Sequence, residues 1–168
     1  MNLDLCCGPR KPEGYYGIDI FAFEGVDKVH DLNFGIPLPD NSCDNVRAHD
    51  AIEHIKDGRM IMGEIWRVLK NGGMVDILVP STDGRGAFQD LTHVSFWNEN
   101  SFGYWINVES WRDYYRYNRL FELVELHTTP LSSERVCHVI FKARAVKNIN
   151  WLETYKKRNK LQIIEGEI

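Results

Sequence analysis

Long apolar runs, paired cysteines and internal repeats are all missing from this sequence of 168 residues. No apolar run approaches the ~20 residues that a helix needs to cross a bilayer, so we expect no membrane partner. Asp4 interrupts the amino terminus at once, which argues against a secretory signal peptide. These absences favour a cytoplasmic protein.

Cysteine is scarce, and its spacing excludes the commonest cysteine sites. The four residues are Cys6, Cys7, Cys43 and Cys137. None of them forms the C-x-x-C pair that is typical of zinc sites, and adjacent cysteines are poorly placed to bridge each other. We therefore expect free thiols, as in a reducing compartment.

A strong excess of charge is missing as well. The net charge is −4, and a composition that is 43% hydrophobic and 26% charged is ordinary for a globular protein. The mild acidic balance argues against a general nucleic-acid surface, so nucleic acid is not an expected partner. The length fits one domain, which we place at residues 1–147, followed by a tail over residues 148–168.

The residues that are present predict an α/β fold. Short apolar runs bounded by turn residues predict strands. Helical spacing of apolar residues over 61–69 ends at Asn71-Gly72-Gly73, and a second helix is expected near Asn98, whose side chain would cap the turn of Ser101. The seven expected strands lie near residues 2–6, 15–20, 27–30, 44–49, 74–79, 121–127 and 135–145.

The link between the first two strands is unusually short. Only ten residues run from Cys6 to Tyr15, and they include Pro9 and Pro12. A parallel crossover normally needs a dozen or more residues, usually helical, so an irregular loop is predicted in place of the first crossover helix. Met1 lies almost on the first strand, so no N-terminal helices are expected either. One face of the sheet should then be thinly covered, and a second copy or a partner subunit is a plausible cover.

Two strand ends hold the most informative residues. The run Leu3-Asp4-Leu5 enters the small-residue turn Cys6-Cys7-Gly8, and a second run ends on Asp19. Ligands of open parallel sheets bind outside the carboxyl ends of strands, where an acid can accept hydrogen bonds from a ribose diol. Only Gly8 stands where a dinucleotide fingerprint needs three glycines, so a pyrophosphate cradle is poorly supported. The pattern indicates a bound nucleoside.

Five segments resemble, in order, the motifs of class I S-adenosylmethionine-dependent methyltransferases, in particular small type-11 members. The first is similar to the family's L-D-L-G-C-G turn, with Cys6 in place of the first glycine. A positive φ at that position would strain Cys6, because only glycine adopts such angles freely. The resemblance implies a doubly wound, Rossmann-like sheet with an antiparallel C-terminal strand. The other four segments are residues 30–32 with 36–46, residues 48–54, residues 64–73, and Asp90-Leu91-Thr92-His93 with Phe96.

The resemblance also implies S-adenosylmethionine as cofactor and a set of residues that contact it. Asp19 is expected to bind the ribose, although a strand-end acid can instead cap a turn. Asp31 is expected to accept from the adenine amino group, although it can also be a solvated loop acid. Asp4 would accept backbone N–H bonds from the turn or meet the methionine ammonium through water. The full set is Asp4, Cys6, Cys7, Gly8, Asp19, Ile20, Asp31, Leu32 and His49.

Two residues are candidates for proton transfer at the acceptor. His93 lies three residues after Asp90, which would orient it as a general base, and Glu53 precedes His54 in the segment after the fourth strand. The alternatives are a structural latch for His93 and a favourable helix-dipole position for Glu53. A metal site made of His49, Asp50, His54 and His93 is a further alternative. His49 and His54 are five residues apart, off the i, i+4 spacing of helical metal ligands, so no metal is predicted.

The acceptor is not determined by the sequence, and we favour a small molecule or a glycan. Residues 96–121 hold ten of the twenty aromatic residues, which either contact the acceptor or a second subunit, or fill the core. A second interpretation of the chain is a catalytically degenerate cofactor-binding or scaffold subunit that needs a partner.

Overall fold

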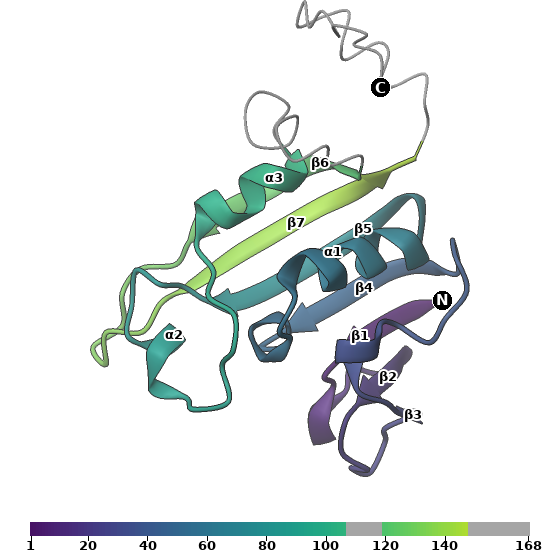
Figure 1. Cartoon of the computed structure of the whole chain (residues 1–168), viewed down its shortest axis with the longest axis horizontal. Helices are drawn as coiled ribbons and strands as arrows, with labels where there is room; N and C mark the ends of the chain where they lie inside the picture. Colours follow the sequence, from purple (N-terminus) through teal and green to yellow (C-terminus); the bar gives the residue numbers. More distant parts are fainter. Residues whose placement is uncertain (107–118, 148–168) are drawn as a thin grey trace, which may run out of the picture.

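The computed structural model describes residues 1–106 and 119–147 and places seven strands in one sheet (Figure 1). Their order is β3-β2-β1-β4-β5-β7-β6. Within this order the strands from β3 through β2, β1 and β4 to β5 pair in parallel, whereas β7 is antiparallel to both β5 and β6. The predicted mostly parallel sheet with an antiparallel C-terminal strand is thus confirmed. The strands are β1 (Asn2–Leu5), β2 (Tyr15–Asp19), β3 (Lys28–Val29), β4 (Cys43–His49), β5 (Leu69–Pro80), β6 (Leu120–Thr128) and β7 (His138–Val146).

The helices are short apart from α1 (Gly58–Val68). The Asp57 carboxylate caps α1 by accepting from the backbone N–H groups of its first turn, Arg59 and Met60. The predicted cap at Asn98 is confirmed, because Asn98 and Ser101 form a reciprocal capping box at η4. None of the described helices combines the length and apolar character that crossing a membrane requires. The remaining helices are η1 (Gly8–Arg10), η2 (Leu32–Phe34), η3 (Ile52–His54), α2 (Gly86–Gln89), η4 (Glu99–Phe102) and α3 (Gly103–Ile106).

The predicted boundary between α1 and β5 is wrong by several residues. The helix ends at Val68, and Leu69 is already extended, with φ −65° and ψ 143°. The Asn71-Gly72-Gly73 segment, predicted to end the helix, therefore lies inside β5. Gly72 has φ 77°, and the pairing of β4 with β5 is irregular at this end. Strand pairing with β4 starts before the glycines, which a local pattern does not reveal.

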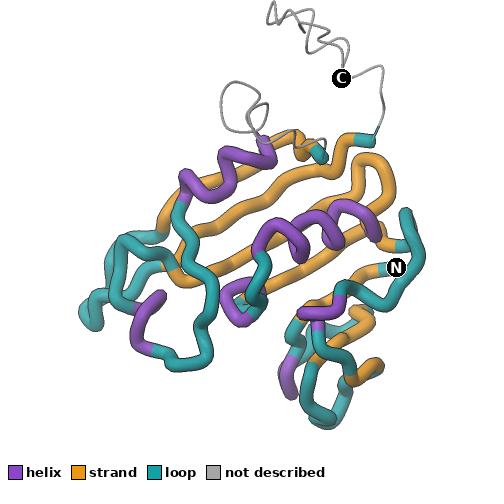
Figure 2. The backbone as a smooth tube through the Cα atoms, viewed as in Figure 1, coloured by secondary structure: helices purple, strands orange, loops and turns teal. Residues whose placement is uncertain are grey.

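The helices α1 and α3 cover the same face of the sheet, toward the viewer in Figures 1 and 2. Side chains alternate between buried and partly exposed along β4, β5 and β7. The buried set, such as Val75, Ile77 and Phe141, packs with Ile61 and Ile65 of α1 in one core. The hydrophobic core therefore lies on one side of the sheet.

The opposite face of the sheet is polar and paired. Arg47 of β4 donates to Asp4 of β1 at 2.8 Å, and Lys142 of β7 lies 2.9 Å from a Glu125 oxygen of β6. These pairs follow from strand alternation, which places every second residue away from the core. The predicted thin cover of one face agrees with this arrangement, whereas the predicted partner on that face stays a prediction.

The first link is the predicted irregular loop, with only the single turn η1 between β1 and β2. It lies directly on β2 at Gly17, where an added Cβ would come 2.5 Å from Cys7 Sγ and 2.6 Å from the Lys11 side chain. Only glycine allows this close approach. The loop thus replaces a crossover helix as the cover of the first two strands.

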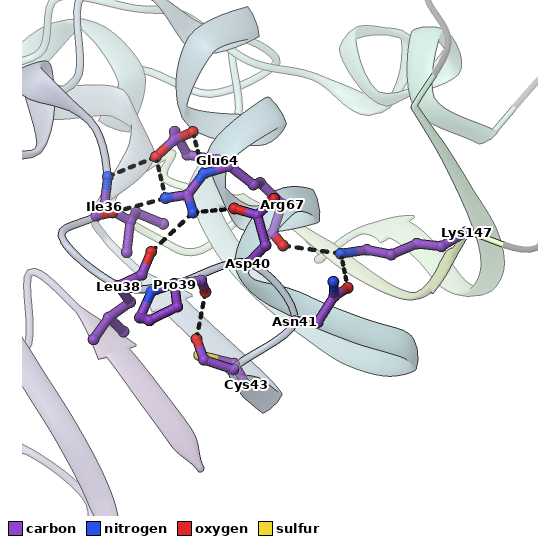
Figure 3. Close-up of polar contacts among 10 residues, drawn as sticks. Ile36, Leu38, Pro39, Asp40, Asn41, Cys43, Glu64, Arg67 and Lys147 are labelled. Atoms are coloured by element: carbon purple, nitrogen blue, oxygen red, sulfur yellow. Dashed lines mark hydrogen bonds and ion pairs between the residues drawn. The ribbon is translucent and has the colours of Figure 1, made fainter.

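A polar network holds the segment before β4 against α1 (Figure 3). The Arg67 guanidinium donates to both Glu64 carboxylate oxygens at 2.7 Å. It also donates to the carbonyls of Ile36 and Leu38 at 2.8 Å and to Asp40 at 2.7 Å. The bonds from Arg67 hold the pKa of Glu64 below its usual range. This network places residues 36–40, and through them the loop after β3.

Replacing Arg67 by alanine should lower the free energy of unfolding by about 2–3 kcal/mol, because charge-assisted bonds and a half-buried Glu64 partner are lost together. Arg67→Lys should be less destabilising than Arg67→Ala but still less stable than the wild type, because an ammonium keeps the positive charge but cannot form the paired hydrogen bonds of a guanidinium. Urea unfolding measures both. Arg144→Ala, which removes one exposed bond to Gly72, is the control. An Arg67→Ala protein as stable as this control would contradict the assigned role.

Candidate cofactor and active site

The strand order reverses between β1 and β4, and two strained residues flank that point. Cys6 follows β1 with φ 50°, and Asp50 follows β4 with φ 48°. Both angles lie in the left-handed region, which few non-glycine residues adopt and which is less costly for Asp than for Cys; Asn41 and Arg135 also adopt it. Cys6 Sγ lies 4.0 Å from the carbonyl oxygen of Ala51, so the two turns touch. Cys6 therefore has the positive φ that, according to the sequence analysis, would strain this residue.

Asp19 ends β2 and ties the first turn to it. Its side chain is buried, with Oδ2 accepting from the Gly8 N–H at 2.9 Å and Oδ1 from the Phe21 N–H at 2.9 Å. This is the turn-capping contact considered as its alternative role. Each carboxylate oxygen has a second lone pair that a ribose hydroxyl can use. The ribose contact stays a prediction, now with the carboxylate orientation known.

Asp31 caps η2 and is oriented by Asn33. Its Oδ1 accepts from the backbone and side-chain nitrogens of Asn33, both at 2.9 Å, and these bonds lower the pKa of the Asp31 carboxyl. The neighbouring Leu32 is buried, whereas Ile20 after β2 is exposed. The carboxylate therefore stays ionised at the strand end, as an adenine contact requires, and that contact stays a prediction.

Asp4 has a partner that the sequence did not indicate. The carboxylate is fully buried, with Oδ1 accepting from Arg47 rather than from the backbone of the turn, and Oδ2 without a partner. Burial raises the pKa of Asp4 despite the Arg47 charge. Arg47 faces Asp4 because β1 and β4 are neighbours, which only strand pairing reveals.

His49, the last residue of β4, bonds sideways to the next strand. Its Nε2 lies 3.2 Å from Asp76 Oδ1 of β5, and this contact lowers the pKa of Asp76. The strand-end position agrees with the sequence-based prediction. A contact with the methionine end of the cofactor stays a prediction.

The two thiols of the turn, Cys6 and Cys7, have low nucleophilic reactivity. Burial, with the nearby charges of Asp19 and Glu53 added, raises the pKa of Cys6 to about 12. Burial likewise raises the pKa of Cys7 to about 11. All four cysteines are free, as predicted. Cys6 and Cys7 are therefore suited to shaping the turn rather than to nucleophilic chemistry.

Glu53, His54 and His93 meet at the same edge, beyond β4. One ligand-type atom from each side chain lies within 4.8 Å of the others. The loop after β5 is held on η3, because the N–H groups of Val94 and Ser95 donate to the Glu53 carbonyl at 2.8 and 3.0 Å. This anchoring brings the two predicted catalytic residues together and adds His54.

The Glu53 carboxyl is buried. The residue is 1% exposed, and among the described residues neither carboxyl oxygen has a partner with full hydrogen-bond geometry, although the backbone N–H groups of Ala51 and Glu53 lie close enough to favour its charged form. Burial raises the pKa of Glu53 to about 8, with the charges of Asp50 and Asp90 contributing. A carboxyl with this pKa exchanges a proton near neutral pH, which is the property expected of a general acid or base.

His93 is held by the main chain. Its Nδ1 lies 3.0 Å from the Ala87 carbonyl, which can only accept, so Nδ1 carries the proton and Nε2 the lone pair. Asp90 Oδ2 lies 3.9 Å from Nε2, and the same carboxylate bonds Thr92 instead. The Ala87 contact is what the latch interpretation predicts, yet it leaves Nε2 able to accept a proton.

The aromatic residues of 96–121 divide between core and surface. Trp97, Phe102, Trp105 and Phe121 are buried, and Phe102 stacks on Phe141 at 4.4 Å, as the core-filling alternative predicts. Phe96 is exposed, and it lines with Trp97 and Tyr104 a cavity of about 650 Å³ beside the start of α1. Trp111, Tyr114, Tyr115 and Tyr117 lie outside the described residues.

The acidic side chains at this edge fit S-adenosylmethionine. Within the described part of the chain, Asp4 Oδ2 and both Glu53 oxygens are buried without a partner of full hydrogen-bond geometry, and Asp19 and Asp31 are oriented by fixed bonds. A cofactor with a sulfonium, an ammonium and two ribose hydroxyls supplies the positive charge and the hydrogen-bond donors that these acids lack.

Comparison with known proteins finds methyltransferases. The methyltransferase domain family matches residues 23–77. A demethylmenaquinone methyltransferase from Anoxybacillus flavithermus is 28% identical over 119 residues, a match that covers 56% of this chain and 50% of that relative. Over these residues the chain resembles class I methyltransferases. It spans about half the length of the curated relatives it matches.

Solved structures share the fold of this chain. A methyltransferase from Bacillus halodurans superposes with a TM-score of 0.61 at 16% identity, covering 87% of this chain and 92% of the other. The 1,6-didemethyltoxoflavin-N1-methyltransferase of Burkholderia thailandensis, solved with S-adenosylhomocysteine, gives 0.61 at 13% identity over 87% and 71% of the two chains. Both confirm the fold predicted from the sequence.

Replacing Cys6 by glycine should stabilise the protein relative to Cys6→Ala by about 1 kcal/mol. Both variants lose the sulfur, and only glycine relieves the left-handed strain at φ 50°. Urea unfolding of the two variants measures the difference. Equal stabilities would show that the turn is not strained at this position.

Glu53→Gln should change how stability depends on pH. The folded pKa of about 8 lies above the unfolded value near 4.5, so the stabilisation of neutral Glu53 is complete below about pH 4.5 and is lost as the pH rises to about 8. Relative to the variant, the wild type should lose up to about 1.4 kcal/mol per pH unit across this range. Urea unfolding at pH 5, 6.5 and 8, with EDTA present, tests this. A difference independent of pH would contradict it.

Proposed function

We propose that this chain transfers a methyl group from S-adenosylmethionine to a small-molecule acceptor. The observation that supports the proposal best is the arrangement at the strand-order reversal. The strained turn of Cys6 lies at this reversal, and the buried Asp19 and Asp31, which caps η2, follow the next two parallel strands beside it. Open α/β sheets bind their ligands at such a reversal, outside the carboxyl ends.

The chemistry asks little of the protein beyond positioning. When bound, the cofactor supplies a methyl group already activated on a sulfonium, with a neutral thioether as the leaving group. The chain must orient the acceptor in line and take its proton where the nucleophile carries one. His93 Nε2 has the lone pair for that role, and Glu53 beside it exchanges a proton near neutral pH.

The acceptor side of the edge is apolar. Four exposed apolar residues surround His93 in the sequence of the loop after β5, and two of their rings, Phe88 and Phe96, stack at 5.2 Å. We infer an acceptor with a flat, apolar body, which such rings can bind. The demethylmenaquinone methyltransferases among the relatives act on a molecule of this general kind. The four residues are Phe88, Leu91, Val94 and Phe96.

Isothermal titration of the purified protein with S-adenosylmethionine and S-adenosylhomocysteine tests the proposal, with NAD as a control. Binding of the first two in the micromolar range, and none of NAD, is expected. No binding of either would reject the proposal and return the chain to the scaffold interpretation, which the comparisons do not support.

Asp19→Asn should weaken S-adenosylmethionine binding about 10–100-fold, the worth of charge-assisted hydrogen bonds to a buried carboxylate. Asp44→Asn is the matched control, because Asp44 is an exposed acid at the opposite, amino end of β4. The same titration measures both, and circular dichroism checks the fold. Unchanged affinity in Asp19→Asn would exclude Asp19 as the ribose ligand.

A further inference from the structure

We propose that Glu53, His54 and His93 form a binding site for a divalent transition-metal cation of the zinc class. The three side chains come from two segments, η3 and the loop after β5, and gather beside the proposed methyl-transfer site. Two imidazole nitrogens and a carboxylate oxygen are a recurrent ligand set of zinc and non-haem iron proteins.

The spacing of the three ligand atoms suits a cation after a small contraction. They lie within 4.8 Å of one another. In a tetrahedral site with metal–ligand bonds of ~2.0–2.1 Å, the ligand atoms are roughly 3.3 Å apart. The ligand atoms would therefore have to approach one another by up to about 1.5 Å when a cation binds.

Glu53 is the strongest independent indication of a missing ligand. Its carboxyl is buried, and among the described residues its two oxygens have no partner with full hydrogen-bond geometry, the nearest donors being the backbone N–H groups of Ala51 and Glu53. Buried polar groups in native proteins are otherwise hydrogen-bonded, and an isolated buried carboxyl is destabilising. A cation that replaces the carboxyl proton provides the absent partner.

The tautomers of both histidines suit metal ligation. His54 Nδ1 lies 3.3 Å from the Thr92 carbonyl and 3.2 Å from Thr92 Oγ1, whose only hydrogen goes to Asp90. Both neighbours of this nitrogen therefore accept, so Nδ1 is protonated and Nε2 keeps its lone pair. His93 has the same tautomer through Ala87. A ring N–H donated to a backbone carbonyl is the usual support of a metal-bound histidine.

The surrounding charge favours a cation over an anion. Asp50 and Asp90 both lie close enough to Glu53 for their charges to raise its pKa. The nitrogen ligands select zinc, iron(II) or cobalt(II) over magnesium and calcium, which prefer oxygen alone. Three protein ligands leave a coordination position open, as in catalytic rather than structural zinc sites.

A role for the cation in catalysis rests on the proposed methyl transfer, whereas its binding does not. With the cation bound, the His93 Nε2 lone pair and the Glu53 carboxylate would serve as ligands and would not take the acceptor's proton. The cation would instead bind an oxygen of the acceptor and lower the pKa of a coordinated hydroxyl. The site would therefore favour an acceptor with a hydroxyl or carbonyl oxygen next to its flat body.

The test is a titration of metal-free protein with Co²⁺, followed by visible absorption, and then displacement by Zn²⁺. We expect one Co²⁺ per chain with d–d bands of a four- or five-coordinate ion. Glu53→Gln, His54→Ala and His93→Ala should each weaken binding at least tenfold, while His127→Ala, which changes an exposed histidine on β6, should not. Circular dichroism checks that each variant is folded, and Glu53→Gln is nearly isosteric.

Two outcomes would overturn the proposal: no stoichiometric Co²⁺ binding by the wild type, or binding that the three ligand variants leave unchanged. The titration contains no S-adenosylmethionine, and S-adenosylmethionine affinity is measured separately on protein treated with EDTA. Loss of the metal site and failure of the methyl-transfer proposal are therefore distinguished.

Discussion

The short link between β1 and β2 is the constraint on which the rest of this structure depends. Ten residues from Cys6 to Tyr15 return the chain to the start of a parallel strand, too few for a crossover helix. The loop lies instead on β2, in contact at Gly17. The described helices α1 and α3 lie on the face that holds the core, and the opposite face carries charged pairs such as Asp4 with Arg47.

The carboxyl edge of the sheet concentrates the unfavourable features of the fold. Cys6 and Asp50 have left-handed backbones, and the carboxyls of Asp4 and Glu53 are buried with oxygens that lack partners. Strain and unpartnered charge are destabilising, and they persist where the surrounding structure holds them for function. The Arg67 network, with its five bonds at 2.7–2.8 Å, supplies rigidity away from this edge. Stability and ligand binding are thus located in different parts of one small sheet.

Local patterns predicted much of this arrangement. The missing crossover helix followed from chain length and prolines, the cap at Asn98 from its side chain, and the strain at Cys6 from the absence of a glycine. The patterns failed where the structure depends on pairing between strands that are far apart in the sequence. β5 starts at Leu69 because β4 pairs with it there, and Asp4 bonds Arg47 because β1 and β4 are neighbours.

The sequence by itself determined the α/β class, the positions of the strands and the residues at their ends, because hydrophobic alternation and turn chemistry act over a few residues. Only the tertiary structure decided that Glu53 and His54 meet His93, some forty positions later in the chain. That meeting depends on backbone bonds from Val94 and Ser95 to Glu53, which anchor the loop after β5 on η3. Contacts of this kind join segments far apart in sequence, so no local pattern contains them.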